Sequence, residues 1–150
     1  MKKIFAVLSF LAFIVVPTAF AQTNAGNKPA VKYKTPELTV AQIDQWLAKP
    51  DQVLVLDIRR PDELITFGSF PVFLNIQYVD LEKNLAYIPK DRSIITVSNH
   101  AGRAFAAGDL LTSKGYKVIG AAGSENYEQQ GGKAVTKIQK PAPKPVAANQ

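Results

Sequence analysis

The sequence predicts an α/β fold, with a small, mainly parallel sheet flanked by helices and with flexible N- and C-terminal tails. Short β-rich runs alternate with segments of helical periodicity between residues 37 and 132. One run, Val53–Leu56, is wholly apolar, which is typical of a strand buried on both faces. Alternation at this spacing indicates helical crossovers between parallel strands, with helices on both faces of the sheet.

The first helix is expected over Val40–Leu47. Thr39 is a favourable N-cap residue, and Gln42 three positions later completes a capping-box pattern. Apolar side chains then recur at helical spacing on one face, among them Trp46, which we assign to the core. The polar stretch 49–51, which contains a proline, ends this helix.

The apolar run Val53–Leu56 gives the first strand, which ends at Asp57. A weaker strand is expected at Phe73–Ile76, followed by a short helix over Asp80–Leu85. Ser93–Val97 is a second β-rich run and gives the second strong strand.

A longer helix is expected over Arg103–Lys114, with Gly115 at its C-cap position. A third strand is expected over Lys117–Ile119, and a last short helix over Ser124–Gln130, with Ser124 as its N-cap. The residues of the longer helix that we expect to face the core are Phe105, Ala106, Leu110 and Leu111.

The composition excludes several classes of site. The chain contains no cysteine, so it has no disulfide framework, no thiolate metal site and no cysteine nucleophile. Its one histidine, His100, lacks partners for a metal site, and we expect neither a metal nor a cofactor. All 12 acidic residues but only half of the 18 basic residues lie between positions 37 and 132. The net positive charge therefore belongs to the ends of the chain, and no nucleic-acid partner is expected.

Residues 1–21 have the pattern of a cleaved signal peptide. Two lysines precede an apolar stretch, Ile4–Val16, and Ala19-Phe20-Ala21 gives a small-x-small cleavage pattern. The apolar stretch is shorter than the roughly 20 residues of a spanning helix, which argues against an uncleaved anchor. We therefore expect cleavage after Ala21, a periplasmic or secreted bacterial protein, and no membrane span in the mature chain.

Two stretches flank the predicted domain at 37–132. Residues 22–36 are polar and contain lysine, glycine and proline, which is typical of a flexible linker. Residues 133–150 are rich in lysine and proline and have no core-forming pattern, so we expect a disordered, extended tail. This tail is either a solvated end or a contact with an anionic surface.

A loop that follows the second strong strand has the features of an anion site. Ligands in α/β sheets sit beyond the carboxyl ends of the strands. Successive backbone N–H groups in a tight strand-to-helix loop converge, and the helix N-terminus adds positive partial charge. Arg103 either contacts the anion or braces the loop. We expect the anion-binding loop to comprise Ser98, Asn99, His100, Ala101, Gly102 and Arg103.

The segment from about Leu38 to Gly132 resembles a single rhodanese-like domain. That family has Asp-x-Arg after a strand, then Gly-His-Ile-Pro-Gly-Ala, Leu-Pro-Lys-Asp, the active loop Cys-x-x-Gly-x-Arg, and a closing Gly-Gly-x-x-x-Trp. The corresponding segments here are Asp57–Arg59, Gly68–Phe73, Ile88–Asp91, Ser98–Arg103 and Gly123–Glu128. The resemblance implies a rhodanese-like sheet, with Asp57 and Arg59 supporting the loop.

The departures from this pattern bear on function. Ser98 stands at the family's catalytic cysteine, Ala101 at its glycine, Ser69 at its histidine, and Val72-Phe73 at its Gly-Ala. The resemblance implies chemistry in which a thiolate takes a sulfur atom as a persulfide and passes it on. A serine hydroxyl is far less acidic and forms no persulfide. We therefore expect no catalytic residue in this loop and no ordinary sulfur transfer.

Two functions from different classes follow. The first is a non-catalytic module whose loop binds a small oxyanion or an acidic group of a protein. The alternative is a divergent sulfurtransferase or a phosphate-ester hydrolase that uses Ser98, which needs a base within reach. His100 is expected at the rim of the loop, and Arg59-Arg60 with Asp62-Glu63 as a surface ion-pair cluster. A third possibility is an adaptor that acts through its lysine- and proline-rich tail.

Overall fold

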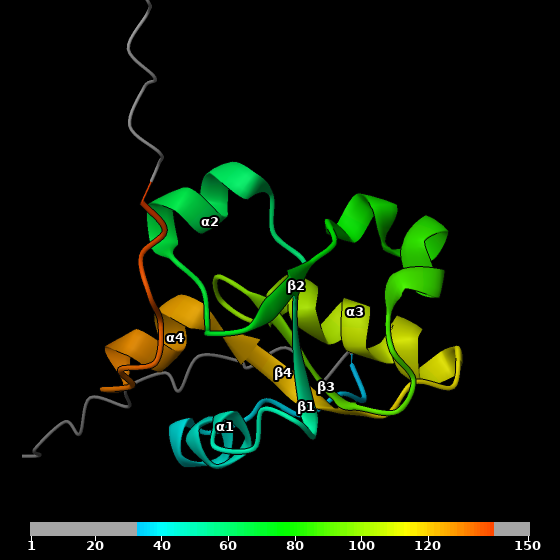
Figure 1. The fold of residues 1–150 in the computed structure, drawn as a ribbon, viewed down its shortest axis with the longest axis horizontal. Helices are drawn as coiled ribbons and strands as arrows, with labels where there is room; N and C mark the ends of the chain where they lie inside the picture. The colour runs from blue at the N-terminus through cyan, green and yellow to red at the C-terminus, as the bar shows by residue number, and fades with distance from the viewer. Residues whose placement is uncertain (1–32, 140–150) are drawn as a thin grey trace, which may run out of the picture. The chain divides into compact units, whose positions relative to one another are not determined.

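The computed structural model describes residues 33–139 as one mixed α/β unit. Its four strands are all parallel and lie in the order β2-β1-β3-β4 (Figure 1). The mainly parallel sheet predicted from the sequence is therefore confirmed. The strands are β1 at Val53–Asp57, β2 at Phe73–Asn75, β3 at Ser93–Ser98 and β4 at Val118–Gly123.

Helical segments connect the strands and close the fold. The helix α2 was not predicted; Pro61 is at its start, and Asp62 and Glu63 in its first turn suit the positive end of a helix dipole. The segment η1 is a 3₁₀ helix rather than the short helix expected at 80–85. The helical segments are α1 at Val40–Leu47, α2 at Pro61–Phe67, η1 at Tyr78–Tyr87, α3 at Gly102–Ser113 and α4 at Ser124–Gln129.

Two hydrophobic cores lie on opposite faces of the sheet. Because side chains alternate along a strand, Leu54 and Leu56 face α3 and η1, whereas Val53 and Val55 face α1 and α4. The two central strands β1 and β3 are buried along their whole length. This double coverage fixes the carboxyl ends of the strands, where the candidate site lies.

The face that α3 turns to the core matches the expected one only in part: Leu111 is fully buried, as expected, and Leu110 packs at the edge of the core. Phe105, Ala106 and Leu110 are only half-buried. The N-terminal segment crosses α3 at Gly108, where a Cβ would come within 2.5 Å of the Thr35 side chain. Small residues are needed for that close approach, so the helix packs through Ala104, Ala107, Gly108 and Leu111.

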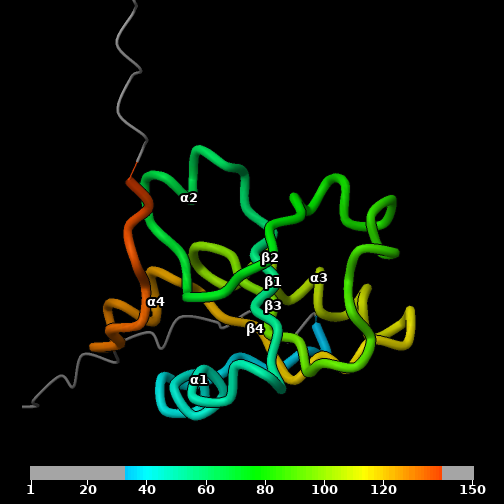
Figure 2. Tube along the Cα trace, viewed as in Figure 1, coloured from blue at the N-terminus to red at the C-terminus, as the bar shows by residue number. Residues whose placement is uncertain are grey.

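The folded body extends past both expected boundaries. The backbone N–H groups of Lys34 and Thr35 donate to the Asp109 carboxylate on α3. Thr136 forms an antiparallel bridge with Ser69, and the segment 131–139 passes from α4 to the C-terminal end of α2 (Figure 2). Residues 33–36 and 133–136 thus belong to the domain, because hydrogen bonds hold them there.

The expected leader, and most of both flanking stretches, lie outside the described residues. Within 33–139, no helix is both long and apolar enough to cross a bilayer.

Candidate functional site

Ser98 is the last residue of β3 and is almost completely buried. Its Oγ accepts a long hydrogen bond, 3.4 Å, from the backbone N–H of Ala104 in the first turn of α3. Within residues 33–139, no carboxylate or imidazole makes a hydrogen bond to this hydroxyl. The side chain therefore accepts one weak hydrogen bond from the first turn of α3 and has no base to activate it.

The charged pair Asp57–Arg59 lies at the end of β1 and is fully buried. The guanidinium is bidentate on the carboxylate, with Nη2–Oδ2 at 2.6 Å and Nε–Oδ1 at 2.9 Å. Ser69 donates a further hydrogen bond to Asp57 Oδ2, also at 2.6 Å. The surface location expected for Arg59 is wrong, because this carboxylate and three further acceptors satisfy its guanidinium inside the protein.

The remaining donors of Arg59 tie three other segments to β1. Nη2 donates to the Gly68 carbonyl at the end of α2, at 2.7 Å. Nη1 donates to Asn99 Oδ1 at 2.8 Å and to Ser124 Oγ at 2.9 Å. We call this set, Asp57, Arg59, Gly68, Asn99 and Ser124, the Arg59 hub. It fixes the loop after β3 against the start of α4.

The Arg103 guanidinium pairs with the Glu63 carboxylate and not with groups inside the loop. Its two terminal nitrogens bind the two carboxylate oxygens of Glu63, with Nη1–Oε2 at 2.9 Å. The hydrogen bond from Arg103 lowers the pKa of Glu63, and the same contact raises the pKa of Arg103. Of the two roles considered for Arg103, the structure shows bracing, with an acidic partner on α2 instead of carbonyls or Asp57.

His100 lies at the rim of the loop, with an exposed side chain. Its Nδ1 is 3.1 Å from Asn126 Oδ1, and its Nε2 is 3.7 Å from Glu125 Oε1, so it faces α4. This position separates the imidazole from the Ser98 hydroxyl. The two side chains do not form a nucleophile–base pair in this arrangement.

The backbone of the loop carries donors that the protein leaves unused. Across the described part of the chain, the N–H groups of His100, Ala101 and Arg103 have no hydrogen-bond acceptor. The loop packs closely on Gly123, where a Cβ would come within 2.9 Å of the Asn99 carbonyl. Unpaired N–H groups at a helix start are the elements of an anion site, and of these three residues His100 is exposed whereas Ala101 is fully buried.

Two residues of the described chain other than glycine have positive φ, Val72 at 55° and Ala101 at 61°. Both stand where the rhodanese-like pattern has glycine. Left-handed backbone is strained for a side chain with Cβ, most of all for a β-branched one. These two turns therefore have a backbone conformation that ordinarily favours glycine.

Sequence reasoning missed part of this network. Glu63 was placed in a surface cluster, whereas its carboxylate is nearly buried and accepts from the Arg60 backbone N–H, a contact that an arginine at the N-cap does not signal. Ser124, expected as the N-cap of the last helix, is instead the first residue of α4 after the N-cap Gly123, and its hydroxyl accepts from Arg59. The buried contact of Ser69 and the contacts of Asn75 gave no signal of their own, because isolated polar residues in connections are usually exposed. Asn75 donates to the backbone carbonyls of Asp57 and Arg59. No group of three or more metal-ligating side chains occurs among residues 33–139.

The chain is similar in sequence to a curated protein and similar in fold to solved structures. No protein-family model matches the chain. A sulfurtransferase from Allochromatium vinosum is 31% identical over 80 residues, which cover 53% of this chain and 74% of the relative. A crystal structure of a rhodanese-related protein from Thermoplasma volcanium aligns with a TM-score of 0.59 and 25% identity, covering 67% of this chain and 97% of that one.

A single-domain sulfurtransferase from Saccharomyces cerevisiae has the same fold. It aligns with a TM-score of 0.55 and 22% identity, over 69% of this chain and 96% of the yeast chain.

Replacing Arg59 tests the hub. We expect Arg59→Ala to lower the free energy of unfolding by about 3–5 kcal/mol, because it leaves Asp57 buried and unpaired. The neighbouring Arg60→Ala removes an exposed, solvent-screened ion pair and is expected to cost far less than Arg59→Ala. Urea unfolding at neutral pH measures both. Equal losses for the two variants would contradict the role given to Arg59.

Replacing Val72 tests the strained turn. Val72 is exposed, so Val72→Gly loses little packing and removes left-handed strain. We expect a gain of about 0.5–1 kcal/mol. Val79, also exposed, lies in η1, outside the positive-φ region, and Val79→Gly is expected to destabilise by a similar amount. Thermal unfolding distinguishes the two signs, and a loss of stability in Val72→Gly would oppose the strain argument.

Proposed function

Because this chain belongs to the rhodanese-like domain family, we propose that it is an exported, non-catalytic member. In this proposal the loop 98–103 binds a small oxyanion or an acidic group of a protein partner. The observation that carries the proposal is Ser98, which replaces the family's cysteine and whose hydroxyl is buried against α3 without a base.

The loss of sulfur transfer follows from chemistry that the loop lacks. A persulfide needs a thiolate, and the chain has no cysteine anywhere. A second way to use the loop, as a phosphate-ester hydrolase with Ser98 as nucleophile, needs a general base beside the hydroxyl. His100 faces α4 instead, and Asp57 is held by Arg59 and Ser69. These contacts favour binding over catalysis.

Anion binding is supported by the backbone of the loop rather than by its side chains. The N–H groups of His100, Ala101 and Arg103 are unpaired within the described chain and lie at the start of α3. Both nearby guanidiniums are neutralised, Arg59 by Asp57 and Arg103 by Glu63. Peptide dipoles therefore hold the proposed ligand, and the site itself carries little net charge. The affinity for a free ion is expected to be weak for this reason.

Export rests on the signal-peptide pattern of residues 1–21, which lie outside the described residues. A compartment that oxidises thiols also suits a chain without cysteine.

Sulfur transfer is the first test. We expect the chain to show no thiosulfate-to-cyanide turnover, and Ser98→Cys to gain measurable turnover if the loop keeps the family's geometry. Asn99→Cys, which places the thiol one position along the same loop, serves as the control and is expected to stay inactive. Turnover by the unaltered chain that Ser98→Ala abolishes would overturn the proposal in favour of an enzyme.

Anion binding is tested by titration with sulfate and phosphate at constant ionic strength. We expect the amide NMR signals of His100, Ala101 and Arg103 to shift together. Glu63→Gln releases Arg103, so we expect it to tighten binding about fivefold. Asp62→Asn removes an exposed carboxylate of the same helix and is expected to change affinity less than about twofold. If neither anion shifts the three amide signals, the proposal that the loop binds a small oxyanion is contradicted.

A further inference from the structure

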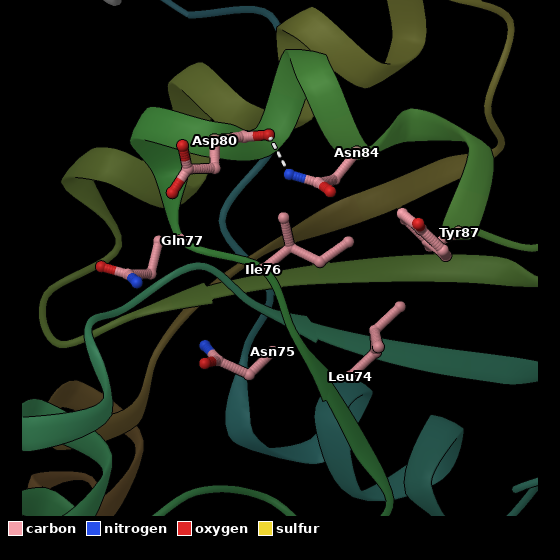
Figure 3. Close-up of a pocket in the computed structure, with 7 residues that line it drawn as sticks. All are labelled: Leu74, Asn75, Ile76, Gln77, Asp80, Asn84 and Tyr87. Atoms are coloured by element: carbon pink, nitrogen blue, oxygen red, sulfur yellow. Dashed lines mark hydrogen bonds between the residues drawn. The ribbon is translucent and has the colours of Figure 1, made fainter.

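A hollow beside β2 lies outside the function proposed above, because no residue of the 98–103 loop lines it. It has a volume of about 360 Å³ and is formed by β2, the turn after it and η1 (Figure 3). Small-molecule sites in proteins occupy roughly 300–1,000 Å³. The hollow therefore has the size of a site for one small ring.

One end of the hollow is apolar. The side chains of Leu74 and Ile76 supply apolar surface, and the Tyr87 ring lies at the same end as Leu74 (Figure 3). Tyr87 is 74% exposed, and within residues 33–139 it makes neither a ring contact nor a side-chain hydrogen bond. Its ring is thus aromatic surface that a ligand in the hollow can cover.

The rest of the lining offers both donors and acceptors. Both N–H groups of Asn75 are used on backbone carbonyls, so its Oδ1 remains as an acceptor. Asn84 donates to the Asp80 carbonyl and keeps a second N–H and its Oδ1. Within the described chain, the Gln77 amide, the Asp80 carboxylate and the Tyr87 hydroxyl have no hydrogen-bond partner. Donors therefore remain on Gln77, Asn84 and Tyr87, and acceptors on every one of these side chains.

This mixture disfavours three classes of occupant. An anion would meet the Asp80 carboxylate, and none of the side chains that line the hollow is cationic. An ammonium ion would leave the donors of Gln77 and Asn84 unpaired, and a purely apolar group would remove every polar atom from water without a partner. A neutral ligand whose groups both donate and accept satisfies all of these side chains.

A pyranose ring has this combination of properties. Each of its hydroxyls donates and accepts, and the hydroxyls project from the ring in several directions. The polar side chains also approach from several directions: Asn75 and Asn84 lie on opposite sides of the hollow, with Gln77 and Asp80 at the end away from Tyr87 (Figure 3). A planar base, whose polar atoms all lie in one plane, fits this arrangement less well. The C–H groups on one face of a sugar pack on the negative face of an aromatic ring such as Tyr87.

We propose that the hollow between β2 and η1 binds one pyranose ring of a neutral carbohydrate. Gln77, Asp80, Asn75 and Asn84 bind its hydroxyls, and one face of the ring packs on Tyr87. Because the hollow holds a single ring and its tyrosine is exposed, the expected dissociation constant is about 1–10 mM. The proposal is independent of the 98–103 loop, so either one can fail without the other.

Titration of the full chain with methyl pyranosides tests the proposal, with the side-chain amide NMR signals of Gln77 and Asn84 as the readout. Methyl glucoside, galactoside and mannoside differ in the orientation of single hydroxyls, and we expect at least one of them to shift both signals in a saturable way. Sorbitol carries similar hydroxyls on an open chain. We expect it to bind at least about fivefold more weakly, because its chain must be ordered on binding.

Two tyrosines of η1 provide matched variants. Tyr87→Ala is expected to weaken binding about fivefold, whereas Tyr87→Phe keeps the ring and is expected to change the affinity less than about twofold. Tyr78 is also exposed but does not line the hollow, so Tyr78→Ala is expected to leave the affinity unchanged. Asp80→Ala removes the carboxylate acceptor and is expected to weaken binding about fivefold.

The proposal is overturned if none of the three methyl pyranosides shifts the two signals at about 100 mM, well above the expected dissociation constant. Equal affinity for sorbitol, or an affinity that Tyr87→Ala leaves unchanged, would also overturn it. Lysine amide serves as a cationic probe, and tighter binding of this probe than of the pyranosides would show that the hollow selects a cation instead.

Discussion

The buried guanidinium of Arg59 is the constraint on which the carboxyl end of the sheet depends. An arginine removed from water is tolerated only where a counter-charge and further acceptors meet its donors. Asp57 supplies the charge, and Gly68, Asn99 and Ser124 supply the remaining acceptors. Because these groups come from the ends of β1, α2, β3 and β4, one side chain positions every connection that borders the 98–103 loop.

The charges around that loop cancel in pairs. Asp57 matches Arg59, and Glu63 matches Arg103, so neither cation is left to attract a ligand. What remains unpaired within the described residues is backbone N–H, in a loop shaped by the left-handed Ala101 and by the close approach of Gly123. Under the function proposed above, recognition at this loop depends on the positions of the backbone N–H groups more than on net charge.

The sequence predicted β1, β2, β3 and α1 well, since short apolar runs and a capping box are local signals. The strand expected over Lys117–Ile119 was too short, because β4 runs from Val118 to Gly123 through glycine and alanine, which carry no β-rich pattern. The helix α2 was missed because seven residues are too few to show a helical period. The Arg59 hub and the Glu63–Arg103 pair were not predictable from spacing. Their partners lie 40 and 65 residues apart in the chain, and an isolated arginine is ordinarily exposed. The resemblance drew attention to the segment between β3 and α3 but did not show that Arg59 and Arg103 are both neutralised.

Contacts that join such distant segments also impose an order on folding. Desolvation of the Arg59 guanidinium is favourable only after the ends of β1, β3 and β4 have met. Closing loops of that length is the slow part of folding. We expect the hub to form late, after the transition state, and interactions of that kind slow unfolding without speeding folding. The guanidinium then stabilises a sheet that has already assembled. Slower unfolding lengthens the lifetime of the folded chain in the presence of proteases that cleave its opened state.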